Sequence, residues 1–394
     1  MSGSTASSAE RAALLVVAAL VVAAHVAWFF AFRWESTPDT KEYAAAARSL
    51  RDGRGFLDAR GAPETGRTPG YPLLVAALAL RPNAIAIVQH ALIVAVALMT
   101  AWFLRGRPRA AIAALALIGF DPALFAAATL LMTEALFVFV MQAGALALLA
   151  AMRRGSPAIA AAAGVLIGFA PLVRPIAIVV ALPLIAIAAI ASRARTAAVT
   201  LAFALPALLL PSLWVLRNER ATGVATLSTV AGANMLYWRA AGTLAMNELP
   251  GFVAGRDETA YHVRFFSIQR TIRGNAVGII AAHPAAFVRC AINGDLHMLF
   301  DPEPHLPMHA GFPERDVLFV VLVAMRIAMV AAAVAGIVAL WRIDRAAAML
   351  CGAMIVYFLV LSAGPEANFL STRFRAPIVP FESMAAAFAV RWLR

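Results

Sequence analysis

Long runs of apolar residues alternate along this chain with short polar links. Most runs are about 17–25 residues long, the length that a helix needs to cross the ~30 Å hydrocarbon core of a bilayer. The runs are continuously apolar rather than alternating, which favours helices over the strands of a barrel. The pattern predicts an all-α polytopic membrane protein with ten spans, at residues 12–32, 83–104, 109–120, 123–151, 157–173, 175–192, 196–216, 317–340, 346–362 and 374–392.

The polar links predict how the chain is oriented. When the spans are counted from a cytoplasmic N-terminus, every short basic link falls on the same side, and the positive-inside rule makes that side the cytoplasm. These links contain Arg105, Arg107 and Arg109, Arg153 and Arg154, Arg193 and Arg195, Arg342 and Arg345, and Arg391 and Arg394.

The opposite, outer side of the membrane holds two substantial regions. One is a first loop at 33–82 with juxtamembrane helices, and the other is a large region at 217–316 whose mixed polarity predicts packed helices rather than a β domain. A shorter loop, 362–373, lies on the same side. We interpret 1–394 as a single transmembrane domain carrying these outer regions.

Three segments leave the span count open. The fifth and sixth spans flank Arg174 and Pro175 and could form one broken hairpin. The run 70–80 is too short to cross, so it lies in the interface or dips in and returns. The first apolar run is too long for a signal peptide and lacks a cleavage site after it, so we expect a transmembrane helix.

Composition supports the membrane class and excludes others. The chain is 62% hydrophobic with a net charge of +12, and its mean hydropathy is +0.82. Its arginines are scattered at span ends rather than clustered in a basic domain, so no nucleic-acid partner is predicted. Cys290 and Cys351 are not expected to pair, and neither has metal-ligand spacing.

Asp39 is the first candidate for chemistry. Thr37 can cap a helix, Pro38 suits its first position, and Asp39 then falls in the first turn, where the helix dipole favours an ionised carboxylate. Tyr43 follows one turn later on the same face. The alternative is that Asp39 only starts the helix.

A second candidate is the run from Glu64 to Pro72. Pro69 and Gly70 predict a turn where the chain re-enters lipid, with Tyr71 following it. Arg67 precedes this turn at headgroup depth, and its planar guanidinium suits a pair of phosphate oxygens. An interfacial arginine that merely anchors the helix is the alternative.

Charged residues within the apolar runs are costly and normally face a cavity or a partner. Asp121 opens the turn before the fourth span, and Glu134 is predicted about three turns into that span. Glu134 could serve as a structural partner for Arg174, at the end of the fifth span.

Other polar groups are predicted on the outer side. Arg217 and Asn218 follow the seventh span, Asn234 lies in the large outer region, and Arg373 and Arg375 open the last span. Two arginines entering a span from the outer side oppose the positive-inside trend, which favours an anionic ligand. The outer histidines, His283, His297, His305 and His309, have no metal-site spacing, so no cofactor is predicted, although a divalent cation stays an open alternative.

Several motifs are absent from the sequence. It contains no Walker loop, no GxGxxG fingerprint after a strand and no GxSxG elbow. Nothing on the cytoplasmic side is suited to hold a nucleotide. An enzyme acting at the outer face would therefore need a substrate that is energised within the membrane.

The landmarks resemble a known family in their order along the spans. They are Asp39-x-x-x-Tyr43, Gly53-x-Gly55, Arg67-x-Pro69-Gly70-Tyr71-Pro72, Asp121-Pro122, Thr133-Glu134, Arg174-Pro175, Arg217-Asn218 and Arg373-x-Arg375-x-Pro377-x-x-Pro380. This pattern is similar to the GT-C class of membrane glycosyltransferases, and within it to the bacterial group of protein O-mannosyltransferases and aminoarabinose transferases.

The resemblance implies a GT-C fold in the bacterial inner membrane and a sugar donor on a polyprenyl phosphate. It implies a glycolipid, polysaccharide or protein acceptor at the periplasmic face, and a catalytic aspartate in the first outer loop, here Asp39. The chain departs from larger members in lacking their C-terminal soluble domain and the Glu-Lys-Pro-Pro sequence of the aminoarabinose transferases.

Chemistry agrees with that implication. A glycosyl phosphate has a good leaving group, so one carboxylate suffices as the base and cations must hold the departing phosphate, whereas a glycosidase needs paired carboxylates. We expect an inverting transferase with Asp39 as base, and phosphate ligands drawn from Arg67, Arg217, Arg373 and Arg375. The alternatives are a transporter or lipid flippase, which predicts repeated halves and broken helices, and a catalytically silent assembly subunit.

Overall fold

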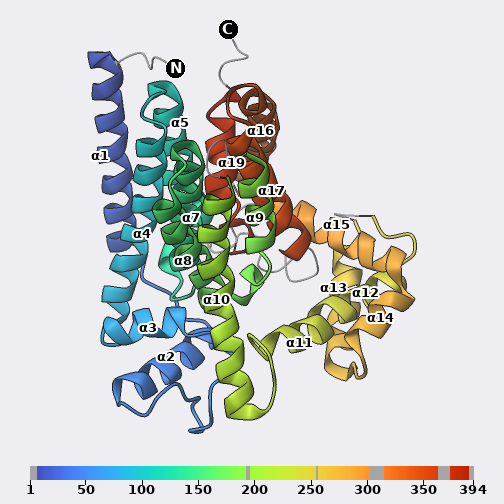
Figure 1. Ribbon diagram of the computed structural model, residues 1–394. Helices are drawn as coiled ribbons and strands as arrows, with labels where there is room; N and C mark the ends of the chain where they lie inside the picture. The colour runs from blue at the N-terminus through green and yellow to red at the C-terminus, as the bar shows by residue number, and fades with distance from the viewer. Residues whose placement is uncertain (1–6, 192–195, 254–255, 302–314, 363–372, 390–394) are drawn as a thin grey trace.

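The protein is described by a computed structural model that covers residues 7–191, 196–253, 256–301, 315–362 and 373–389. Within these ranges the chain is helical, with β pairing limited to two isolated bridges. Figure 1 shows a bundle of long helices with a smaller group of short helices beside it. The α-helices are α1 Ser8–Ala31, α2 Pro38–Arg51, α3 Gly70–Ala77, α4 Pro82–Phe103, α5 Pro108–Gly119, α6 Pro122–Thr129, α7 Glu134–Arg154, α8 Pro157–Val173, α9 Ala181–Ala191, α10 Thr196–Thr222, α11 Val230–Asn234, α12 Ala241–Asn247, α13 Glu258–Thr271, α14 Ala276–Ala282, α15 Pro284–Phe300, α16 Arg315–Ile343, α17 Arg345–Ser362 and α19 Val379–Ala386.

The predicted class, an all-α multi-pass membrane protein, is confirmed. Six helices in the described ranges are long and apolar enough to cross a bilayer, namely α1, α4, α7, α10, α16 and α17. Counting each of two bent pairs, α5 with α6 and α14 with α15, as one span brings the total to eight. The fifth predicted span coincides with α8, and the sixth divides into a 3-10 turn and α9. Both are shorter apolar helices, so the count of ten stays a prediction.

The prediction of one continuous span at 123–151 is wrong. The helix breaks after Thr129 and restarts at Glu134, which is therefore the first residue of α7 rather than three turns into a span. At the break Leu130 is extended and forms a parallel bridge with Glu35, from the link between α1 and α2. The break brings the start of α2 beside the start of α7.

Gln89 of α4 replaces the hydrogen bonds that the broken helix gives up. Its side chain is fully buried. Its Nε2 donates to the carbonyls of Ala128 (3.0 Å) and Leu130 (2.6 Å), and its Oε1 accepts from the Tyr71 hydroxyl (2.7 Å). Because lipid offers backbone carbonyls no partner, a side chain of this kind is what makes a break inside the bundle tolerable.

We expect Gln89→Leu to destabilise the protein by about 3 kcal/mol, because each buried polar group left unpaired costs about 1–3 kcal/mol. Gln142→Leu is the matched control. Gln142 is also fully buried, but it donates to one group, Thr100 Oγ1 (2.9 Å). Thermal unfolding of both variants in the same detergent measures the difference. Equal losses would contradict the role given to Gln89.

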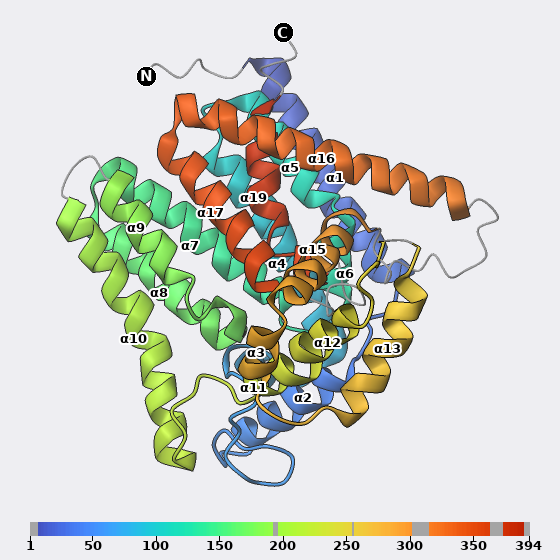
Figure 2. The ribbon, with the colours of Figure 1, turned by 90° about the vertical axis from the view of Figure 1, so that its right-hand side faces the viewer.

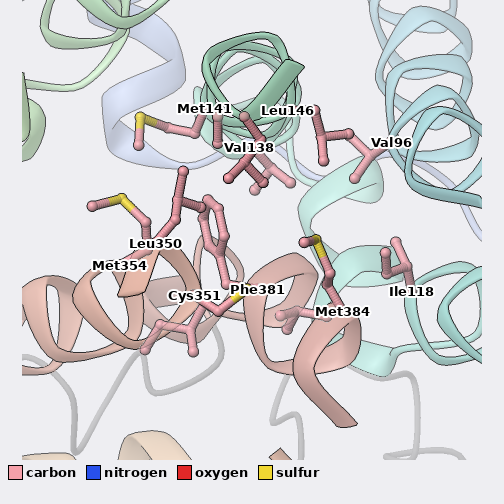
Figure 3. Packing of buried hydrophobic residues seen from close by; sticks show 14 of the residues in the cluster. Val96, Ile118, Val138, Met141, Leu146, Leu350, Cys351, Met354, Phe381 and Met384 are labelled. Carbon is pink, nitrogen blue, oxygen red and sulfur yellow. The ribbon is translucent and has the colours of Figure 1, made fainter. Parts of the chain in front are cut away.

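The last predicted span, 374–392, is not one continuous helix in its described part, 374–389, and residues 390–392 lie outside the described ranges. Residues 373–375 are helical, but the helix proper is α19, with eight residues buried at the centre of the bundle. Gly336 of α16 allows this close approach, since a Cβ there would lie 1.9 Å from the Ala385 carbonyl oxygen. Figure 3 shows the side chains that meet around α19: Phe381 and Met384 with Val138 and Met141 of α7 and Leu350, Cys351 and Met354 of α17.

The large outer region forms a helical unit of its own. Its helices α12 to α15 lie together in Figure 1, and Figure 2 shows α12, α13 and α15 from the side. They bury a separate apolar core around Met246, Tyr261, Phe265 and Cys290. This agrees with the prediction of packed helices rather than strands.

Side-chain contacts place the basic links together at one end of the bundle, the upper end in Figure 1. Arg153, in the last turn of α7, pairs with Asp344, between α16 and α17. Arg109 of α5 lies 3.6 Å from Glu10, in the first turn of α1. Helices α2 and α3 lie at the opposite end. The predicted basic residues Arg193, Arg195, Arg391 and Arg394 fall outside the described ranges.

Candidate active site

The first helix of the outer loop starts as its sequence predicts. Thr37 caps α2, with Thr40 completing a capping box, Pro38 takes the first position, and Asp39 lies in the first turn. The start of α2 is fixed to the break before α7, because Thr40 Oγ1 donates to the Leu131 carbonyl (3.0 Å). Asp39 and Glu134 therefore both lie at helix N-termini in one place.

Two arginines hold the Asp39 carboxylate. Its Oδ1 lies 2.7 Å from Arg67 Nη2, and its Oδ2 lies 3.2 Å from Arg373 Nη2. The Asp39 side chain is 28% exposed, so it faces solvent at the edge of this arrangement. The structure thus unites three residues that are far apart in sequence.

Each of these arginines is also anchored by a second acid. Arg67 Nε donates to Glu42 Oε2 (2.6 Å), and Arg373 Nε donates to Glu134 Oε1. Arg174, the C-cap residue of α8, lies 2.7 Å from the same Glu134 oxygen. We call Asp39, Glu42, Arg67, Glu134, Arg174 and Arg373 the acid–arginine cluster. Its Glu134–Arg174 pair is the one that the sequence suggested.

The cluster carries more positive than negative charge away from solvent. Glu134 is 1% exposed, and the three arginines are 11–16% exposed, whereas Glu42 is 57% exposed. Apart from Glu42, two carboxylates face three guanidinium groups. Because a poorly solvated charge is costly when unbalanced, this arrangement favours one further anion.

Two tyrosines line the inner side of Arg67. Its guanidinium carbon lies 5.2 Å from the centre of the Tyr43 ring, and Tyr43 meets Tyr71 edge to face, with ring centres 5.2 Å apart. Burial raises the pKa of the Tyr43 hydroxyl and outweighs the opposing effect of Arg67. Burial by itself lowers the pKa of Arg67, but the carboxylates of Asp39 and Glu42 oppose this, and its pKa is raised. Arg67 stays charged beside a neutral phenol.

Glu64 shapes the loop that presents Arg67. Its Oε1 accepts hydrogen bonds from the backbone amides of Gly66 (2.6 Å) and Arg67 (2.9 Å). Ser228 Oγ donates to the Gly66 carbonyl from the other side (2.6 Å). Gly70 follows at a close approach, because a Cβ there would lie 2.8 Å from the Leu172 carbonyl oxygen, near the end of α8. The loop is thereby fixed against the end of α8, whose C-cap residue is Arg174.

Arg217 and Asn218 lie within α10 rather than after a span. Arg217 donates to the carbonyls of Glu64 (2.6 Å) and Phe56 (2.9 Å), and Asn218 donates to the Thr226 carbonyl (2.8 Å). They brace the first outer loop and the chain that follows α10. Among the described residues, neither is hydrogen-bonded or ion-paired to the Asp39 carboxylate, so they contribute through the loop.

Three other predicted residues lie away from the cluster. Arg375 is buried and donates to the carbonyls of Met298 and Asp301 at the end of α15. Asp121 is buried as the N-cap of α6. Asn234 is exposed at the end of α11.

Sequence reasoning missed four residues. Arg326 of α16 forms a two-bonded pair with Glu382 of α19 (2.8 and 3.1 Å) and lies 3.8 Å from Asp121. These two residues and Gln89 could have been found as polar residues inside apolar runs. Glu42, one turn from Asp39 in a polar helix, carried no such signal.

A metal site is not formed by the described residues, among which no three His, Cys, Asp or Glu side chains gather. The three carboxylates of the acid–arginine cluster each pair with arginine. His305 and His309 lie outside the described ranges. The divalent cation therefore stays an untested alternative.

Comparison with known proteins identifies the fold. No family model and no curated protein matches the sequence, but solved structures do. The oligosaccharyltransferase AglB from Archaeoglobus fulgidus, in complex with an inhibitory peptide and a dolichol-phosphate, aligns with a TM-score of 0.56 and 12% identity over 96% of this chain and 50% of its own. The apo form of the Archaeoglobus fulgidus oligosaccharyltransferase aligns with a TM-score of 0.55 and 14% identity, over 95% of this chain and 50% of its own.

A third structure, of that enzyme tethered to an acceptor peptide with the NVT sequon, gives a TM-score of 0.54 at 14% identity over 95% of this chain and 49% of its own. The chain thus spans half the length of the chains that it matches. These neighbours are GT-C class glycosyltransferases, so this chain has the GT-C fold that its motifs predict. At such identities the likeness concerns the fold alone.

Proposed function

We propose that this chain is an inverting glycosyltransferase that moves a sugar from a polyprenyl-phosphate donor to an acceptor at the outer face of the membrane. The observation that carries the proposal is the Asp39 carboxylate. It is partly exposed and lies between Arg67 and Arg373 at the end of a GT-C bundle opposite the basic links. A base and phosphate ligands are the two elements that this reaction needs.

The proposed reaction is a single displacement. The acceptor hydroxyl or amide gives its proton to Asp39 as its oxygen or nitrogen attacks the anomeric carbon. The bond from that carbon to the phosphate oxygen breaks, and the polyprenyl phosphate leaves with the electron pair. One displacement inverts the configuration of the sugar.

Arg67, Arg373 and Arg174 are the proposed phosphate ligands. Arg67 and Arg373 touch Asp39 through their Nη2 atoms, while their Nε atoms are held by Glu42 and Glu134. A phosphate can therefore replace Asp39 at the Nη2 ends without moving either arginine. Binding of the donor would free the carboxylate to accept a proton at the moment it is needed, and would balance the excess positive charge. Arg217 and Arg375, also predicted as ligands, act by bracing the surrounding backbone.

The finer assignments belong to the same proposal. The basic links favour a cytoplasmic location for their end of the bundle, which supports a position for Asp39 on the periplasmic side of a bacterial inner membrane. The dolichol-phosphate and peptide bound to the archaeal neighbour support a lipid-linked donor. The proposal covers hexosyl or pentosyl transfer to a glycolipid, polysaccharide or protein.

Reconstitution tests the proposal against a flippase. The 49° bend between α5 and α6 is the kind of broken helix that a transporter or flippase predicts. The purified chain is placed in liposomes with radiolabelled polyprenyl-phosphate sugar and a delipidated cell-envelope extract as acceptor. We expect label to pass from lipid to extract. Label that crosses the bilayer while still attached to its lipid would indicate a flippase, and label that does neither would indicate an assembly subunit.

A further inference from the structure

A groove away from the acid–arginine cluster lies where α1 ends and α4 begins. Its volume is about 600 Å³. The lining residues are Arg33, Trp34, Leu80, Arg81, Pro82, Asn83, Ala84 and Ile87. It is therefore formed by the link after α1, the end of the link between α3 and α4, and the first turns of α4.

The groove is held in shape by its own walls. Trp34 Nε1 donates to Asn83 Oδ1 (2.8 Å), which joins the two links. Ala79 and Leu80 both have φ of +55°, a left-handed conformation that non-glycine residues rarely adopt. Trp34 and Leu80 also pack on the buried cluster that contains Tyr43 and Tyr71. The chain thus turns sharply at this point over a fixed base.

The lining is positively charged. Arg33 and Arg81 are both exposed, and no carboxylate lines the groove. In the described part of the chain, neither guanidinium forms an ion pair. Two cations without acids favour an anion.

Large apolar side chains are exposed on the two helices that meet at the groove. Phe30 and Val26 of α1 are 80% and 51% exposed, and Ile87 of α4 is 52% exposed. Arginine and tryptophan at the end of such a surface mark the depth of lipid headgroups. A ligand that fits both parts has an anionic head and a hydrocarbon tail.

We propose that this groove binds the headgroup phosphate of an anionic bilayer phospholipid, whose acyl chains lie along the exposed faces of α1 and α4. Arg33 and Arg81 bind the phosphate, and Trp34 lies at the level of the glycerol backbone. The site is separate from the proposed donor site and does not depend on the proposed function. The bound lipid would fix α1, few of whose residues are buried, to α4.

Native mass spectrometry of the delipidated full chain tests this site. The chain is titrated in turn with phosphatidylglycerol, phosphatidylcholine and inorganic phosphate. We expect selective retention of phosphatidylglycerol, and roughly thirtyfold weaker retention by the double variant Arg33→Gln/Arg81→Gln, since each of the two basic residues at a membrane surface contributes about 1 kcal/mol toward anionic lipid.

The matched control is Arg48→Gln/Arg51→Gln, which removes two exposed arginines of α2 outside the groove and should retain phosphatidylglycerol as the unchanged chain does. Equal loss in both double variants would reduce the effect to net charge and overturn the proposal. Equal retention of phosphatidylcholine, or displacement of phosphatidylglycerol by inorganic phosphate, would also overturn it. Selective displacement of phosphatidylglycerol by polyprenyl phosphate would overturn it too, because it would assign the groove to the donor.

Discussion

Replacing Asp39 by asparagine is expected to lower sugar transfer by about 10²–10⁴-fold, the usual contribution of a general base. Asparagine keeps the shape of the side chain but cannot take the acceptor proton. The donor should bind at least as tightly as before, because asparagine competes less than a carboxylate for Arg67 and Arg373. Transfer rates and polyprenyl-phosphate binding, measured on the same reconstituted preparation, separate the two effects.

Asp52→Asn is the matched control for this variant. Asp52 is an exposed residue at the end of α2, and its partner, Arg54, is also exposed. The Asp52→Asn variant should transfer sugar at the same rate as the unchanged protein. Full activity of Asp39→Asn would remove Asp39 as the base. If Asp39→Asn instead lowers both donor binding and thermal stability, Asp39 serves mainly to hold the two arginines.

Replacing Glu134 by glutamine is expected to cost about 3–5 kcal/mol of stability, because removing one partner of a buried ion pair leaves a charge without compensation. Here one carboxylate, 1% exposed, holds both Arg174 and Arg373. Transfer should fall as well, because two proposed phosphate ligands lose their anchor. Thermal unfolding and transfer rates measure the two losses.

Two further variants test the cause. Glu42→Gln makes the same change in the same cluster at a residue that is 57% exposed, so its cost in stability should be at most about 1 kcal/mol. The double variant Glu134→Gln/Arg174→Gln removes one charge of each sign and should recover at least half of the lost stability. If the double variant is as unstable as Glu134→Gln, packing rather than charge balance explains the effect.

Local sequence signals determined the spans and the start of α2. Hydropathy over a window predicts a membrane helix wherever the run is long enough, so α4, α8 and α17 begin and end close to their predicted positions. The capping residue Thr37, followed by proline and aspartate, predicts a helix start from neighbours alone. These signals also identified Asp39, Arg67, Glu134, Arg174 and Arg373 as residues of interest.

Only the tertiary structure decided which of these residues meet. The break after Thr129 could not be seen in a continuous apolar run, because the partner that stabilises it, Gln89, comes from another helix. That break converts Glu134 from a residue within a span to the start of α7. The packing of α2, α7 and α8 then decides which arginines face Asp39 and which, such as Arg217 and Arg375, bond backbone carbonyls instead. Hydropathy and capping are local properties, whereas the pairing of charges depends on distances between helices that lie far apart in the chain.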